Sequence, residues 1–139
     1  MRSPRSPFRH RRCIIPAIGF YEWQHKEGNK QPFFIRPAGG GYFALAGLWE
    51  HWQGTDGEVI ESCAIITTTA NSLMATIHDR MPVILTNDNL PAWIDAGTQK
   101  EDLLSMLHPC PESMLEAYPV SSRVNNPRNN NSGCIARLE

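Results

Sequence analysis

The sequence predicts an α+β domain built on a largely antiparallel β-sheet with short flanking helices. Short apolar runs separated by turn residues fill residues 13–69, a pattern typical of antiparallel strands. Helical spacing of apolar residues and helix-capping residues first appear after residue 70. The chain has 139 residues, of which 41% are hydrophobic, and this is enough for one domain of ordinary size.

Four strands are predicted in the first half of the chain. Their ranges are Cys13–Trp23, Gln31–Arg36, Tyr42–Trp52 and Glu58–Thr69. Turn residues separate them: Glu-Gly-Asn within 25–30, three glycines within 37–41 and two glycines within 53–57. The close spacing and short turns favour an antiparallel meander, in which each strand pairs with the next.

The second half is predicted to combine short helices with two further strands. Asn71 can cap a first helical segment. A second helix carries one apolar face and ends at Gly97; the face consists of Leu90, Trp93 and Ile94. Another helix begins at a capping box, Thr98-Gln-Lys-Glu101, and stops before Pro109. Strands are predicted over Met81–Thr86 and Tyr118–Ser121, and a loop from Asn125 onward.

The net charge of -1 hides an uneven distribution. Residues 1–12 carry five Arg and no acidic residue, whereas residues 13–139 carry eight Lys/Arg against 14 Asp/Glu. The basic start has no apolar stretch of a secretory signal, and Pro4 and Pro7 obstruct the amphipathic helix of a transit peptide. Two interpretations stay open: a basic contact to phosphates, or a solvated chain end.

Several classes of site are excluded by the sequence. The four cysteines are far apart and form no Cys-x-x-Cys pair, which argues against a structural zinc site and favours reduced thiols in a cytosolic protein. There is no P-loop, no G-x-S-x-G, no G-x-G-x-x-G and no H-E-x-x-H motif. No apolar run approaches the roughly 18 residues of a membrane helix. We therefore expect no metal, no cofactor and no membrane partner.

Two titratable residues are candidates for proton-transfer chemistry. Glu22 lies among aromatic residues, and burial would raise the pKa of its carboxyl group. The alternative is that alternation along a strand turns this side chain toward water. His78 lies at a predicted helix-to-strand junction, where loops commonly position reactive groups. Its alternative is an ordinary surface histidine beside the Asp79–Arg80 pair.

Tryptophans are frequent in this chain, which has four of them. Trp23, Trp49 and Trp52 fall in predicted strands, where an arginine nearby would suit stacking of nucleic-acid bases. The alternative is that these aromatic side chains belong to the hydrophobic core.

Six blocks of sequence, taken together, resemble a known family. They are Arg11–Trp23, Lys30–Phe34, Phe43–Trp49, Ile66–Asn71, Ile77–Pro82 and Pro119–Asn125. In this order and spacing they resemble the SOS response-associated peptidase (SRAP) family of abasic-site processing proteins. The resemblance extends from about Arg9 to the tail and implies a largely antiparallel, barrel-like sheet with flanking helices.

The resemblance also implies a chemistry. Members of the family bind single-stranded DNA and react with the ring-opened aldehyde of an abasic site. An N-terminal cysteine, exposed when the initiator Met is removed, forms a Schiff base through its α-amine and a thiazolidine through its thiol. The product is a covalent protein–DNA crosslink, and the associated peptidase activity removes the leading residue.

Five residues of this chain fall at functional positions of the family pattern. Glu22 and His78 match the catalytic pair: Glu22 handles the proton of the N-terminal amine, and His78 donates a proton to the opening sugar or departing group. Trp23, Thr67 and Arg80 match positions that line the DNA cleft, with Arg80 at a phosphate. No metal or other cofactor is implied.

The chain also departs from the family pattern. It begins Met-Arg-Ser instead of Met-Cys-Gly-Arg, it lacks the family's Asn-Ala-Arg segment, and Ile18 replaces a small polar residue. We therefore expect the N-terminal strands of the barrel to be missing. The expected organisation is a basic lead-in at 1–12, a partial SRAP-like domain at 13–124 and an Asn-rich tail at 125–139.

Three functional hypotheses follow from these observations. The chain is part of an abasic-site crosslinking enzyme, a non-catalytic relative that binds single-stranded DNA, or an inactive truncated fragment. Whether it is an enzyme stays open, because none of its four cysteines is N-terminal and we expect no thiazolidine without one. We expect a cytoplasmic monomer that associates with the nucleoid when bound to DNA.

Overall fold

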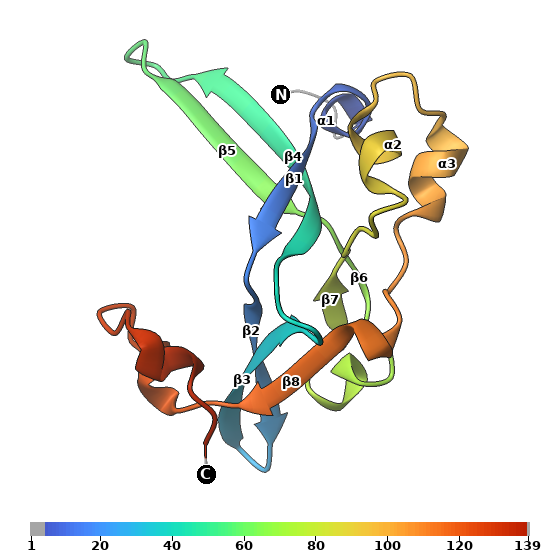
Figure 1. Cartoon of the computed structure of the whole chain (residues 1–139). Helices are drawn as coiled ribbons and strands as arrows, with labels where there is room; N and C mark the ends of the chain where they lie inside the picture. The colour runs from blue at the N-terminus through green and yellow to red at the C-terminus, as the bar shows by residue number, and fades with distance from the viewer. Residues whose placement is uncertain (1–4, 139) are drawn as a thin grey trace.

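The computed structural model describes residues 5–138, with side chains from residue 8 onward. Two three-stranded sheets and one two-stranded sheet form the described part of the chain (Figure 1). The first sheet has the order β1-β4-β5, with strands Arg12–Ala17, Phe43–Gln53 and Val59–Ile65. The second has the order β2-β3-β8, with strands Phe20–Lys26, Asn29–Pro37 and Leu115–Pro119. The third pairs β6 (Thr67–Thr69) with β7 (Arg80–Pro82).

Short helices flank these sheets. The α-helices are α1 (Arg5–His10), α2 (Leu90–Ile94) and α3 (Lys100–Ser105). The 3-10 helices are η1 (Met74–Thr76), η2 (Glu112–Met114), η3 (Ser122–Asn125) and η4 (Ser132–Ile135). All strand pairs are antiparallel, which confirms the α+β prediction, although the described strands do not close into a barrel. No helix within residues 5–138 is long and apolar enough to cross a membrane.

The stretch Cys13–Trp23, predicted as one strand, is divided between two sheets at Gly19. A Cβ atom at Gly19 would lie 2.3 Å from Phe34 Cζ and 2.5 Å from the carbonyl oxygen of Ile35. The backbone therefore passes directly over β3, at a distance that only glycine permits. After this point the chain leaves the first sheet and continues as β2 in the second.

The predicted meander is wrong in its strand order. The hairpins β2–β3 and β4–β5 form as expected, but β3 pairs with β8 and β4 pairs with β1. The reason is non-local burial: Ile35 of β3 and Leu45 of β4 lie in one core cluster without their strands sharing a ladder. Turn residues specify hairpins, whereas core packing decides which hairpins become neighbours.

The predicted capping box at residues 98–101 is also absent. The helix α3 begins at Lys100 after Gln99, and no side chain caps it. Instead, the hydroxyl of Thr98 donates to the carbonyl of Ala92 at 2.6 Å. This bond stabilises the loop between α2 and α3. The predicted strand Met81–Thr86 pairs regularly only within β7, after which Ile84 makes a single bridge to β4.

The basic start of the chain forms helix α1, which Pro7 was expected to obstruct; Pro4 lies outside the described residues. Pro7 lies in the first turn of the helix, where no backbone N–H is needed. The Arg12 guanidinium donates to four carbonyl oxygens at the ends of α1 and α2, those of Phe8, Arg9, Trp93 and Asp95. Arg12 therefore holds two helix ends together, because a cation satisfies unpaired carbonyls there.

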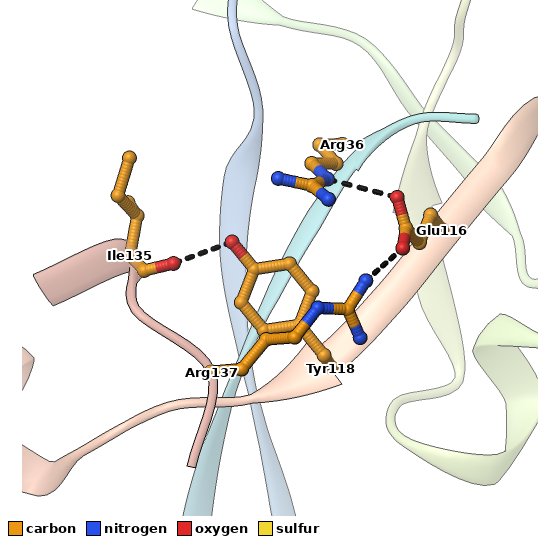
Figure 2. A network of polar contacts seen from close by, with 5 residues as sticks. All are labelled: Arg36, Glu116, Tyr118, Ile135 and Arg137. Atoms are coloured by element: carbon orange, nitrogen blue, oxygen red, sulfur yellow. Dashed lines mark hydrogen bonds and ion pairs between the residues drawn. The ribbon is translucent and has the colours of Figure 1, made fainter. Parts of the chain in front are cut away.

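The Asn-rich tail packs against the second sheet. The hydroxyl of Tyr118 donates to the Ile135 carbonyl at 2.5 Å. Figure 2 shows this contact and the pairing of Glu116 with Arg36 and Arg137. The two guanidinium carbons lie 5.1 and 4.3 Å from the centre of the Tyr118 ring. Residues 122–138, which include the 3-10 helices η3 and η4, are thus fixed to β3 and β8.

Candidate functional site

The strand β2 presents Glu22 because a tight turn forms its hairpin with β3. Glu27 and Gly28 adopt φ values of 52° and 80°, the conformation of a two-residue hairpin turn, and Gly28 makes that conformation accessible. The turn fixes the register in which Glu22 lies opposite Phe33. β2 is an edge strand of its sheet among the described strands, so Glu22 lies beside an unpaired strand edge.

A turn that precedes β7 presents His78. The side chain of Asn71 accepts the backbone N–H of Met74 at 2.9 Å, which confirms the predicted cap, and donates to the carbonyl of Cys110. The N–H of His78 then donates to the Met74 carbonyl at 2.8 Å. These bonds hold His78 just after η1, two residues before β7 begins at Arg80.

The structure brings Glu22 and His78 together. Oε2 of Glu22 lies 4.0 Å from Nδ1 of His78, and Oδ1 of Asp79 lies 3.4 Å from the same nitrogen. The Glu22 side chain is 24% exposed and that of His78 is 38% exposed. The two candidates singled out separately from the sequence therefore form one partly exposed acid–base pair.

Burial raises the pKa of the Glu22 carboxyl group, since the charged form loses solvation. The neighbouring His78 opposes this shift, as does a hydrogen bond from the backbone of Trp23, whereas the charge of Asp79 adds to it. The net direction is upward. A carboxyl group in this environment holds a proton closer to neutral pH than an exposed glutamate does.

Hydrogen bonds orient the imidazole of His78. The backbone N–H of Arg80 donates to Nδ1 at 3.1 Å, and the Arg80 carbonyl lies 3.2 Å from the same atom. When Nδ1 accepts the amide proton, the neutral ring carries its own proton on Nε2. When the ring is doubly protonated, Nδ1 can donate to the Arg80 carbonyl instead. The turn therefore accommodates both protonation states of His78.

Gln24, which the sequence analysis did not select, links the two halves of the pair. Its side-chain amide donates to the Thr76 carbonyl at 2.7 Å. Because Gln24 follows Glu22 by two positions, both side chains lie on the same face of β2. This hydrogen bond fastens the end of η1 to β2, close to His78. The two-residue spacing from Glu22 is the signal that could have identified it.

Arg80 and Thr67 lie on the neighbouring strands β7 and β6. Nη2 of Arg80 donates to the carbonyl oxygen of Thr67 at 2.9 Å and to its hydroxyl oxygen at 3.1 Å. Arg80 is exposed, so its guanidinium group keeps donors available to solvent. The predicted pair is therefore adjacent to His78, with the arginine orientation set by Thr67.

Trp23 lies on the opposite face of β2 from Glu22. Its ring centre is 6.3 Å from that of Tyr21, and its Nε1–H donates to Oδ1 of Asn125 at 2.6 Å. Alternation along the strand turns Tyr21 and Trp23 away from the acid–base pair. Trp23 therefore lies on the face of β2 that points away from Glu22 and His78. No signal in the sequence predicted its hydrogen bond with Asn125.

Comparison with known proteins matches residues 2–127 to the family described as SOS response associated peptidase (SRAP). The chain belongs to the SRAP family. It is 46% identical over 135 residues to the abasic site processing protein YoqW of Bacillus subtilis, covering 96% of this chain and 60% of that protein. It is 36% identical to the abasic site processing protein HMCES of Xenopus tropicalis, covering 96% of this chain and 45% of that protein.

A solved structure has the same fold. A Bacteroides thetaiotaomicron protein matches with a TM-score of 0.91 and 31% identity, over 99% of this chain and 62% of that protein. This SRAP chain therefore spans about 60% of the length of YoqW and of the solved relative. The match to 99% of the chain includes most of the tail beyond residue 127, where the family match ends.

The four cysteines of the SRAP chain are all free thiols, and none lies on β2 or in the turn that presents His78. Cys13 lies on β1, and Cys63 is exposed on β5. Cys110 and Cys134 are buried, and burial raises the pKa of the Cys110 thiol to about 11. Within residues 5–138 no three His, Cys, Asp or Glu side chains gather as a metal site would need.

Proposed function

We propose that this chain recognises abasic sites in single-stranded DNA and moves protons at the opened sugar through Glu22 and His78. The 4.0 Å approach of their side chains carries the proposal. Membership of the SRAP family and the names of the relatives, abasic site processing proteins, support the substrate class. Two residues distant in the sequence meet in one partly exposed place, as a general acid and base must.

Each member of the pair has a separate task. Glu22, with its pKa raised by burial, accepts a proton from an attacking amine and stabilises the positive charge of the iminium that follows. His78 donates a proton to the opening sugar oxygen or to the departing group. The proton comes from Nε2 of the doubly protonated ring, and Nδ1 keeps its own proton, which it can donate to the Arg80 carbonyl 3.2 Å away.

The DNA strand is held beside this pair by Arg80, Thr67 and Trp23. Arg80 binds a phosphate, with its guanidinium group oriented by Thr67. Trp23 offers an aromatic surface for a neighbouring base. Because all four cysteines are unpaired thiols, we also propose that the protein acts in the cytoplasm, at the nucleoid when it is bound to DNA.

The covalent step requires an N-terminal cysteine. Its α-amine condenses with the sugar aldehyde and releases water, and its thiol then adds across the C=N bond to close a thiazolidine. A second candidate function is non-covalent binding of single-stranded DNA, which is supported by the exposed guanidinium group of Arg80 that Thr67 orients.

One pair of assays separates the two candidates. The chain is incubated with single-stranded DNA that carries an aldehydic abasic site, and a band that survives a denaturing gel indicates a crosslink. Fluorescence anisotropy on the same oligonucleotide measures binding. A crosslink would overturn the non-covalent candidate, and the absence of both signals would overturn the proposed function.

Variants test the roles within a crosslinking form that has an N-terminal cysteine. Glu22→Gln and His78→Ala are expected to slow crosslinking while binding stays largely intact. Glu61→Gln and His51→Ala serve as matched controls, because both residues are exposed on the β4–β5 hairpin. Equal loss of binding and crosslinking in both site variants would show a structural role instead.

A further inference from the structure

The C-terminal segment, residues 117–138, differs in charge from the rest of the protein. It holds three arginines and no acidic residue, whereas residues 13–116 hold five Lys/Arg against 13 Asp/Glu. A polyanion approaching the folded body therefore meets mostly like charge, except at this segment and at the basic start. The segment is an electropositive surface on an otherwise acidic body.

Hydrogen bonds fix the backbone of this segment and therefore the positions from which the Arg123 and Arg128 side chains extend. The Ser121 hydroxyl accepts the N–H of Arg123 at 3.2 Å, and Oδ1 of Asn126 accepts the N–H of Arg128 at 3.0 Å. Nδ2 of Asn129 donates to the Arg123 carbonyl at 3.0 Å. These bonds close two consecutive side-chain-stabilised turns on the outside of β3.

Among the contacts of residues 8–138, one of the three arginine side chains stabilises the fold. Arg137 pairs with Glu116 and lies against the Tyr118 ring (Figure 2). Arg123 and Arg128 are exposed, and no described acidic side chain lies within ion-pair distance of either. Their guanidinium groups are therefore available to an external anion.

The segment adjoins the proposed site at Trp23. Asn125, which ends η3, accepts the indole N–H of Trp23. Trp23 and Glu22 project from opposite faces of β2, whose outer edge has no partner strand within the described residues. A DNA strand with one nucleotide at Glu22 and His78 would reach Trp23 by crossing this edge, and its next phosphates would then meet Arg123 and Arg128.

We propose that Arg123 and Arg128 form a second phosphate-binding surface for single-stranded DNA, beyond Trp23 and on the opposite face of β2 from the acid–base pair. The inference rests on the proposed function and extends it, because it assigns a path to the flanking strand. Arginine matches phosphate with paired donors, and Trp23 and the neighbouring asparagine amides provide stacking and hydrogen bonds for bases. A purely anionic polypeptide could pair with Arg123 and Arg128 but has no base to stack on Trp23.

Binding measurements on the full chain test this surface. Two oligonucleotides carry a stable abasic analogue: a short one that reaches only the acid–base pair, and a longer one with nucleotides added on both sides. Arg123→Gln, Arg128→Gln and the double variant are compared with Lys100→Gln. This control removes one positive charge at α3, on the far side of the molecule from η3 and η4 (Figure 1).

The expected result is a loss of affinity for the longer oligonucleotide of about two- to fivefold per arginine. The slope of log affinity against log salt should become shallower by about 0.7 for each phosphate contact removed. Affinity for the short oligonucleotide should not change, and Lys100→Gln should match the wild type. Within the described residues both arginines form hydrogen bonds through their backbones alone, so thermal unfolding should also match.

Three outcomes would overturn the assignment. Unchanged affinity and salt slope in the double variant would remove the second surface while leaving the proposed function intact. Competition by polyglutamate, charge for charge as effective as DNA, would show a general anion site. Failure of the wild-type chain to bind either oligonucleotide would overturn both this inference and the proposed function.

Discussion

Oε2 of Glu22 lies 4.0 Å from Nδ1 of His78, although one residue belongs to a hairpin strand and the other to a turn before β7. Glu22 lies on β2 and His78 follows η1. The side-chain amide of Gln24 joins β2 to η1 by donating to the carbonyl of Thr76. At this distance the charge of His78 affects the pKa of Glu22, and this effect can be measured without any substrate.

Removing His78 should raise the pKa of Glu22 further. The imidazole favours the charged carboxylate, so His78→Ala removes an effect that lowers this pKa. Asp79→Asn should act in the opposite direction, because the Asp79 charge raises it. NMR titration of the Glu22 side-chain carboxyl carbon measures both shifts. Shifts of the same sign in the two variants would contradict this electrostatic arrangement.

Glu22 should make the stability of the protein depend on pH. Its pKa is higher in the folded state than in the unfolded state, so the folded state binds the proton more tightly. The resulting stabilisation is fully present below the unfolded pKa and is lost as pH rises through the folded pKa. Glu22→Gln should remove this loss, as followed by urea unfolding across the acidic-to-neutral range. Glu61→Gln is the control, and a pH-independent difference between wild type and Glu22→Gln would contradict the prediction.

Arg80 should contribute both charge and geometry to DNA binding. Arg80→Gln is expected to weaken single-strand binding about two- to fivefold and to reduce the salt slope by about 0.7. Arg80→Lys should restore the slope but only part of the affinity, because lysine lacks the planar fork that Thr67 orients. Salt-dependent anisotropy measures both quantities. An unchanged slope in Arg80→Gln would exclude a phosphate contact.

The Tyr118 hydroxyl should stabilise the docked tail. Tyr118→Phe removes its hydrogen bond to the Ile135 carbonyl and is expected to cost about 1 kcal/mol of unfolding free energy. Tyr42→Phe is the matched control, since Tyr42 is 75% exposed and should lose almost nothing. Urea unfolding measures both. Equal stability of the two variants would show that the tail is not held by this bond.

Gly19 should tolerate no side chain. Gly19→Ala places a methyl group against Phe34 and the Ile35 carbonyl, and is expected to destabilise the protein by about 1–3 kcal/mol. Gly39→Ala is the control, because a Cβ there meets no atom within 4 Å. Thermal unfolding compares them. A neutral Gly19→Ala would mean that β1 and β2 can separate from β3 without cost.

Local features were predictable because a few neighbouring residues determine them. The turn at Glu27 and Gly28 requires positive φ values at these two positions, which a glycine at the second one makes accessible. Asn71 could be identified as a cap because its amide oxygen reaches the N–H three residues ahead. The capping box at Thr98 failed because a nearby carbonyl, that of Ala92, competed for the hydroxyl group.

The sequence by itself determined the two hairpins, the candidate residues Glu22 and His78, and the family resemblance. Only the tertiary structure decided that β4 joins β1, that Arg12 ties helix ends, and that Asn125 holds Trp23. The physical reason is range. Turns and caps form between residues a few positions apart, whereas strand partners and the approach of Glu22 to His78 depend on which distant apolar faces are buried together.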